Sequence, residues 1–178
     1  MINNRNKEVV AWSIYDFANQ PFTTLIVTFI FSAFFTEYLA SNAQQGTYLW
    51  SLGISITAII VALCSPILGA LADAGGYRKY FLMSASYLCI VATFCLYLFQ
   101  PGQVFNIVGL NLDVATCSLI TFIIANIGFE FGTVFCNSYL ADLSTSNNIG
   151  KVSGYAWGLG FIGGLISLAI SLVFLDLS

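Results

Sequence analysis

Five apolar stretches make up most of this sequence, and each is long enough to cross a membrane. They lie at about residues 9–39, 49–72, 80–99, 114–140 and 152–175. A transmembrane helix needs about 20 apolar residues to cross a hydrocarbon core of about 30 Å. Only 7% of the residues are charged, compared with about a quarter in a soluble domain. The sequence predicts an all-α integral membrane protein, a bundle of five transmembrane helices forming a single domain over residues 1–178.

The basic residues predict how these helices are oriented. All five fall at the same end of the predicted spans: Arg5, Lys7, Arg78, Lys79 and Lys151. Because Lys and Arg favour cytoplasmic loops, we expect a cytoplasmic N-terminus and cytoplasmic loops at 73–79 and 141–151. The connections at 41–48 and 100–113 are then expected as outer loops.

The turn between the second and third spans, SPILGALADAGGYRK (65–79), carries the most specific motif. Gly75 and Gly76 allow a tight turn because glycine reaches positive φ without a Cβ clash. The stretch resembles the loop between helices 2 and 3 of major facilitator transporters, G-x-L-A-D-x-x-G-[RK]-[RK]-[RK], although Tyr77 replaces a basic residue. The matching residues are Gly69, Leu71, Ala72, Asp73, Gly76, Arg78 and Lys79. The resemblance implies a loop that biases inward-open against outward-open states. The residues alone leave Asp73 either solvated or paired with Arg78.

Further stretches narrow the resemblance to one branch of that superfamily. They are W-x-x-Y-D-F-A-N-x-x-F from Trp12, Ser65-Pro66, FCNSYLADL (135–143) and VSGYAWGLGFIGGL (152–165). They are similar to the branch that contains the autophagy-related vacuolar amino-acid effluxers and their bacterial relatives. The resemblance implies a secondary active transporter that moves small solutes, with amino acids as a candidate class, by alternating access.

The number of predicted helices bears on whether the sequence covers a whole transporter. Major facilitator proteins have two six-helix halves with the solute site between them, so five helices predict an N-terminal fragment that pairs with missing C-terminal helices. The expected surroundings are membrane lipid, in a bacterial inner membrane rather than a vacuolar one. A natural short protein is the alternative, serving as a non-transporting assembly partner or as a split half.

Two carboxylates inside the spans are the main candidate functional groups, since ionisable residues within a membrane are costly and usually functional. Asp16 lies in the first span and Glu130 near the middle of the fourth. Each shares a helix face with polar neighbours at helical spacing. The faces comprise Ser13, Asp16, Gln20 and Thr23 in the first span, and Asn126, Glu130, Thr133 and Asn137 in the fourth. We expect Asp16, Asn19, Gln20, Asn126, Glu130 and Asn137 to line a solute or proton pathway. The alternative is that both faces only join helices through hydrogen bonds. The resemblance implies that both spans border the central cavity.

Three other features concern helix packing, helix geometry and membrane anchoring. The fifth span contains small-x-x-x-small pairs, which let helices approach closely, at Gly154 and Gly158 and at Gly160 and Gly164. Pro21 predicts a kink or local unwinding near Asn19 and Gln20. Three tryptophans near span ends, Trp12, Trp50 and Trp157, are predicted as interfacial anchors.

The remaining composition argues against other classes of protein. The sequence has no His, and its five Cys lack C-x-x-C spacing, so no metal site or cofactor is predicted. No basic tract indicates nucleic acid. An intramembrane enzyme is disfavoured because no nucleophile with a base and no catalytic carboxylate pair is present.

Overall fold

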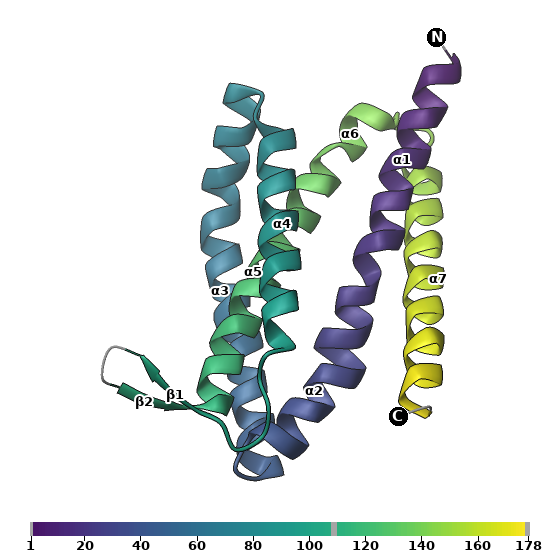
Figure 1. Ribbon diagram of the computed structural model, residues 1–178. Helices are drawn as coiled ribbons and strands as arrows, with labels where there is room; N and C mark the ends of the chain where they lie inside the picture. The colour runs from purple at the N-terminus through teal and green to yellow at the C-terminus, as the bar shows by residue number, and fades with distance from the viewer. Residues whose placement is uncertain (1, 108–109, 177–178) are drawn as a thin grey trace. The chain divides into compact units, whose positions relative to one another are not determined.

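The computed structural model describes residues 2–107 and 110–176, and most of these residues are helical (Figure 1). Within this part of the chain, five helices are long and apolar enough to cross a membrane. They cover Asn6–Leu39, Ala43–Gly75, Arg78–Leu96, Val114–Leu143 and Ile149–Leu175. The predicted all-α membrane fold is confirmed, and each predicted span overlaps one of these helices.

The first span changes its helical geometry after Pro21. It consists of α1 (Ile2–Pro21), a π-helical segment η1 (Phe22–Phe29), α2 (Ile30–Phe34) and a second π-helical segment η2 (Phe35–Leu39). Proline has no N–H to donate to the carbonyl four residues earlier, and the wider turns begin directly after it. The predicted unwinding at Asn19 and Gln20 is therefore misplaced, since both residues lie within α1.

The second span, α3 (Ala43–Gly75), starts earlier than predicted because its N-terminus is capped. The side chain of Asn42 accepts a hydrogen bond from the backbone N–H of Gln45, at 2.9 Å. Such a cap satisfies a donor that the first helical turn leaves free. The connection predicted at 41–48 is accordingly shorter.

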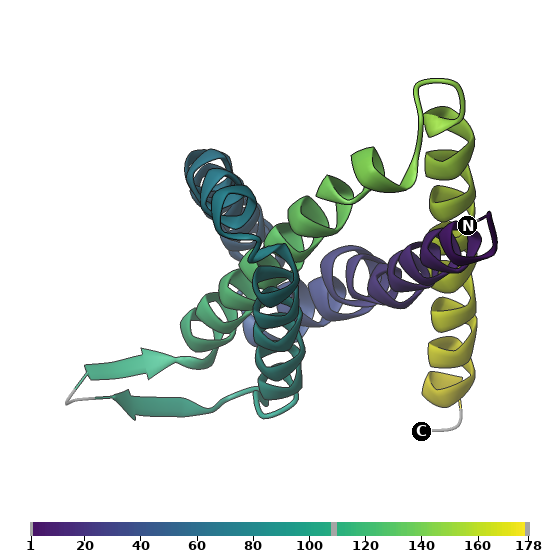
Figure 2. The ribbon, with the colours of Figure 1, turned by 90° about the horizontal axis from the view of Figure 1, so that it is seen from above.

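Of the two glycines predicted to use positive φ in the turn between α3 and α4 (Arg78–Leu96), only Gly76 does so, and Gly75 is the last residue of α3. Gly76 caps α3 with φ of 66°, which side chains with a Cβ adopt only with strain. The helices α3 and α4 run in opposite directions from this turn (Figure 1 and Figure 2).

The connection between α4 and α5 (Val114–Ser138) contains a β-hairpin that was not predicted. Strand β1 (Val104–Ile107) pairs antiparallel with β2 (Leu110–Asp113), with Val104 opposite Asp113. The Asn106 side-chain amide donates to Oδ1 of Asn111 at 3.1 Å. Sequence reasoning treated 100–113 as an irregular loop because Pro101-Gly102 and the shortness of each strand obscured the pairing.

After α5, a short helix α6 (Leu140–Leu143) and the long helix α7 (Ile149–Asp176) complete the described chain. The residues form two compact units. The terminal unit comprises Met1–Ser32 and Cys136–Ser178, and the central unit comprises Ala33–Phe135. The single domain expected over 1–178 remains a prediction.

An aromatic cluster forms the core of the central unit. The Trp50 ring stacks on Phe122 with centroids 4.0 Å apart and lies 5.3 Å from the Phe35 ring. Trp50 is 7% exposed, so its predicted role as an interfacial anchor is wrong. A large aromatic ring near a span end can be covered by neighbouring helices, and the sequence pattern does not distinguish the two environments.

Candidate solute site

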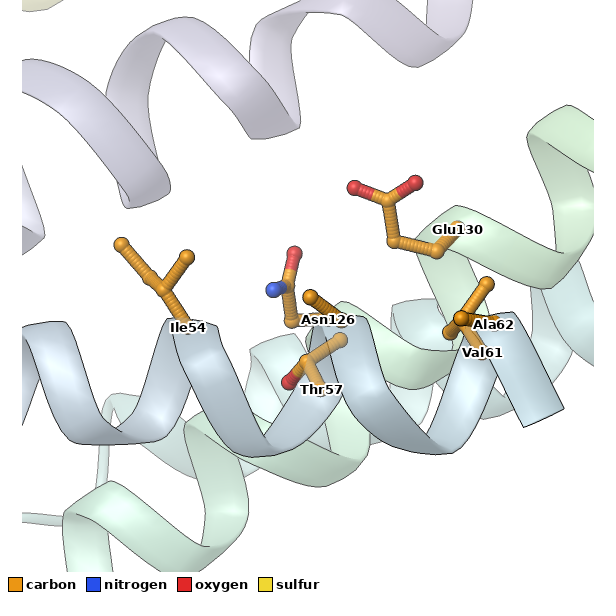
Figure 3. A pocket seen from close by; sticks show the side chains of 7 residues that line it. Ile54, Thr57, Val61, Ala62, Asn126 and Glu130 are labelled. Atoms are coloured by element: carbon orange, nitrogen blue, oxygen red, sulfur yellow. The ribbon is translucent and has the colours of Figure 1, made fainter.

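A pocket of about 300 Å³ lies between α3 and α5 in the central unit (Figure 3). It is lined by Ile54, Thr57, Ala58, Val61, Ala62, Asn126 and Glu130. Asn126 and Glu130 are four residues apart and therefore share one face of α5. In Figure 3 their head groups point to the same side. The structure thus brings together two of the predicted pathway residues.

The polar groups of this pocket are poorly satisfied. Thr57 is 1% exposed and Asn126 is 5% exposed, whereas Glu130 is half-buried. Throughout residues 2–107 and 110–176, the Thr57 hydroxyl has no hydrogen-bond partner. In the same ranges, the side chains of Asn126 and Glu130 make no hydrogen bond or ion pair. A buried polar group without a partner costs about 1–3 kcal/mol, so the pocket is suited to a polar ligand or water.

Two glycines hold the helices around the pocket close together. A Cβ on Gly53 of α3 would lie 2.8 Å from a methyl carbon of Leu119 on α5. On α5, a Cβ on Gly128 would lie 2.7 Å from the backbone nitrogen of Cys89 in α4. Gly128 therefore packs directly on the α4 backbone, and this contact fixes the helical turn that carries Glu130.

Asp16 has a different environment, in the terminal unit, where α1 packs against α7 (Figure 1). A Cβ on Gly160 would lie 2.9 Å from a carboxylate oxygen of Asp16, and one on Gly164 would lie 2.6 Å from the Thr24 hydroxyl. A Cβ on Gly163 would collide with the backbone oxygen of Phe17. This is the carbonyl to which residue 21 would donate if it were not proline.

The other predicted residues of the first span lie along the same contact or close to it. The Ser13 side chain is 3% exposed, and its hydroxyl donates to the backbone oxygen of Val9 at 2.9 Å. The Gln20 side chain lies beside Gly164, and Asn19 is half-buried. The indole N–H of Trp12 donates to the backbone oxygen of Cys136 at 2.8 Å, which ties α1 to the end of α5 within this unit.

The structure separates the two predicted glycine pairs of α7. Gly160 and Gly164 pack against α1, together with Gly163, which was not part of either pair. At Gly154 and Gly158 an added Cβ would meet no atom within 4 Å in the described part of the chain. Asn137, the last residue of the predicted polar face on the fourth span, is exposed.

In the loop between α3 and α4, Asp73 is paired with Arg78 rather than only solvated. The Arg78 guanidinium pairs with the Asp73 carboxylate at 2.5 Å, and both groups are partly exposed, at 29% and 57%. Lys79 is exposed, and a Cβ on Gly69 would meet no atom within 4 Å among the described residues.

Sequence reasoning missed the α3 side of the pocket. Thr57 is a lone hydroxyl within the run GISITAIIVA (53–62) and carries no charge to mark it. A usable signal was the spacing of Gly53 and Thr57, four residues apart on one helix face. A small residue and a hydroxyl on the same face favour contact with another helix.

The chemistry of the pocket is that of a weakly polar cavity with one acidic group. It offers a carboxylate, an amide and a hydroxyl on otherwise aliphatic walls. No group of three or more His, Cys, Asp or Glu side chains able to hold a metal ion is found among the described residues. The arrangement can exchange a proton at Glu130 or accept hydrogen bonds from a bound solute.

Comparison with known proteins connects this pocket to a family. The model of the family described as "Vacuole effluxer Atg22 like" matches residues 47–149, which is more than half of the 178 residues. The chain belongs to the vacuole effluxer Atg22-like family. The matched segment of this Atg22-like chain includes all the residues that line the pocket.

Two curated relatives also match the chain. The chain is 29% identical over 178 residues to the uncharacterized MFS-type transporter YxiO of Bacillus subtilis (strain 168), covering 97% of this chain and 38% of the relative. It is 26% identical over 166 residues to an uncharacterized protein of Aquifex aeolicus (strain VF5), covering 93% of this chain and 37% of that protein. The Atg22-like chain thus spans little more than a third of the length of these relatives. No solved structure matches it. The likenesses support a multi-pass membrane protein of the transporter type and favour transport over catalysis.

Proposed function

We propose that this chain forms part of a secondary active transporter that moves small solutes across a membrane by alternating access. The observation that carries the proposal is the α3–α5 pocket, where Glu130 and Asn126 lie unpaired within the segment that matches the effluxer family. A carboxylate without a partner inside a span is energetically costly, and such residues usually belong to a functional pathway. Amino acids are the candidate solute class because the sequence resembles the amino-acid effluxers.

Glu130 is proposed as the proton-coupling group. A carboxyl group in the pocket can take a proton from one side of the membrane and release it to the other as access alternates. Asn126, one turn away, carries both donors and an acceptor in its amide, so it can hydrogen-bond either protonation state of Glu130. Asp16 is proposed as a secondary site, because its surroundings include the α7 backbone at Gly160 rather than the pocket.

The proposed transporter needs helices beyond those described. In major facilitator proteins the solute site lies between two halves, and this chain spans little more than a third of its relatives. The proposed location is a bacterial inner membrane, with the N-terminus in the cytoplasm. Cysteines placed at the exposed positions Gln44 and Asn106 should then react with a membrane-impermeant reagent from outside, and cysteines at the exposed positions Ala74 and Ser146 should not. The reverse labelling would overturn this orientation.

The experiment that tests the transport proposal uses proteoliposomes with an imposed pH gradient. One sample holds the chain alone. The other holds a chimera in which the chain replaces the matching segment of the Bacillus relative. We expect the chimera to accumulate radiolabelled solute from an amino-acid mixture and the chain alone to accumulate none. Strong uptake by the chain alone would contradict the proposed need for further helices, and no uptake by a folded chimera would contradict the proposed function.

A second candidate, a non-transporting assembly partner, rests on the free face of α7. Tyr155, Trp157 and Phe161 are 69%, 78% and 63% exposed, and Gly154 and Gly158 have open space beside them in the described chain. Such a face suits close contact with another helix. The same chimera distinguishes the candidates, because an assembly partner would leave transport unchanged when Glu130 is replaced.

A further inference from the structure

We propose that the α3–α5 pocket binds an alkylammonium ion, with the ammonium group at Glu130 and Asn126 and the alkyl chain against Ile54 and Val61. This inference rests on the proposed function in one respect, namely that solute reaches the pocket from water. It goes further by naming the chemical group that the pocket recognises.

The charge of the pocket favours a cation. Glu130 is the only ionisable side chain among the lining residues, and neither α3 nor α5 contains a Lys or Arg. A carboxylate without a partner in a mostly apolar pocket gains most from an opposite charge that brings its own hydrogen-bond donors. An ammonium group is such a partner.

The hydrogen-bonding groups fit an ammonium group in number. A primary ammonium has three N–H donors and no acceptor. Glu130 offers two carboxylate oxygens and Asn126 one amide oxygen, and in Figure 3 these head groups point to the same side. Asn126 is 5% exposed and its side chain makes no hydrogen bond among the described residues, which is an observation independent of the charge on Glu130.

The size and walls of the pocket favour an organic cation over a metal ion. A volume of about 300 Å³ is at the lower end of the range for small-molecule sites. Hard metal ions take six or more oxygen ligands at short range, whereas four of the seven lining residues are aliphatic: Ile54, Ala58, Val61 and Ala62. These walls can cover an alkyl chain of a few carbons.

The same features disfavour a carboxylate group on the ligand. An α-amino acid would bring a second negative charge near Glu130, with no cationic side chain on α3 or α5 to pair with it. Burying such a charge without a partner is costly. The pocket should therefore bind an amine more tightly than the α-amino acid that differs from it only by a carboxylate. In an amino-acid carrier, the carboxylate would have to be bound outside this pocket.

The test is a binding measurement on the purified chain in detergent, by titration calorimetry with n-butylammonium chloride. Norvaline, which is butylamine with a carboxylate added at the carbon that bears nitrogen, serves as the matched ligand, and sodium chloride serves as the metal-ion probe. We expect butylammonium to bind at least tenfold more tightly than norvaline, with sodium ions failing to compete. Norvaline binding as tightly as butylammonium, or sodium competing at equal concentration, would overturn the inference.

Three variants locate the binding site. Glu130→Gln should weaken butylammonium binding at least tenfold, because a hydrogen bond to a charged group is lost together with the charge. Asn126→Leu, which is close in volume and removes the amide, should weaken it about threefold and gives a second test if Glu130→Gln does not fold. Glu37→Gln changes an exposed carboxylate outside the pocket and should leave binding unchanged.

The outcomes separate this inference from the proposed function. Unchanged butylammonium binding in folded Glu130→Gln, or in folded Asn126→Leu, would overturn the inference even if the chimera transports. Selective amine binding that depends on Glu130, in a chain whose chimera does not transport, would support the inference and contradict the proposed function.

Discussion

The α1–α7 contact and the α3–α5 contact differ in the space that they leave beside a carboxylate. In the terminal unit, glycines of α7 come so close to α1 that a single added carbon would lie 2.9 Å from Asp16 or collide with the Phe17 carbonyl. In the central unit, α3 and α5 leave a pocket in which Glu130, Asn126 and Thr57 find no partner among the described residues.

The difference shows that the side chains of the neighbouring helix determine whether a polar face inside a membrane is closely packed or borders a pocket. The sequence patterns around Asp16 and Glu130 are alike, with one carboxylate and polar residues at helical spacing. Glycines on the partner helix let polar groups pack against backbone. Aliphatic side chains on the partner helix instead leave space beside them, which is available to a ligand.

The largest effect on stability is expected where the glycine contact is tightest. Gly163→Ala should lower the free energy of unfolding by about 1–3 kcal/mol, the usual cost of overpacking, because the new Cβ meets the α1 backbone. Gly158→Ala on the same helix is the matched control and should be neutral, since its Cβ meets no described atom within 4 Å. Unfolding in detergent, followed by circular dichroism, measures both. Equal effects of the two changes would contradict the close α1–α7 contact.

A smaller effect of opposite sign is expected in the pocket. Thr57→Val replaces a buried hydroxyl that lacks a partner, so it should raise the free energy of unfolding by about 1 kcal/mol. Thr121→Val on α5 is the control, because the Thr121 hydroxyl donates to the Cys117 carbonyl at 2.9 Å and that bond would be lost. The same unfolding measurement applies. Destabilisation by Thr57→Val would show that its hydroxyl is satisfied and would weaken the comparison.

The smallest effect is expected at the ion pair of the α3–α4 turn. Asp73→Asn removes the pair with Arg78, but both groups are partly exposed, and such pairs contribute less than about 1 kcal/mol. The change in unfolding free energy should shrink further in high salt because exposed charges are screened. A large, salt-independent loss would mean that this pair is part of the core of the central unit.

The sequence predicted the helices well and the contacts between them poorly. Span length and hydropathy depend on local composition, so all five spans were predicted, and Gly76 was identified because only a positive φ closes that turn. The burial of Trp50 depends on Phe122, more than 70 residues away along the chain, and no local pattern indicates it. The hairpin was missed because each of its strands has only four residues.

The candidate site was predicted on one side only. Glu130 and Asn126 stood out because a carboxylate and an amide are rare inside a span. Thr57 did not, since a single hydroxyl in an apolar helix is common and usually bonds to its own backbone. The space beside a polar residue is a property of the assembled helices, and this is why Asp16 and Glu130 could not be distinguished by sequence spacing.

The central claim is that Glu130 in its pocket, rather than Asp16 in its packed contact, couples solute movement to protons. The most direct measurement compares Glu130→Gln and Asp16→Asn in the chimera, recording pH-driven uptake and solute counterflow in the same proteoliposomes. We expect Glu130→Gln to abolish pH-driven uptake. Counterflow needs no net proton movement, so it should be preserved at solute concentrations high enough to offset weaker binding, while Asp16→Asn reduces uptake only partly. Unchanged pH dependence of uptake in Glu130→Gln, or a greater loss in Asp16→Asn, would contradict the claim.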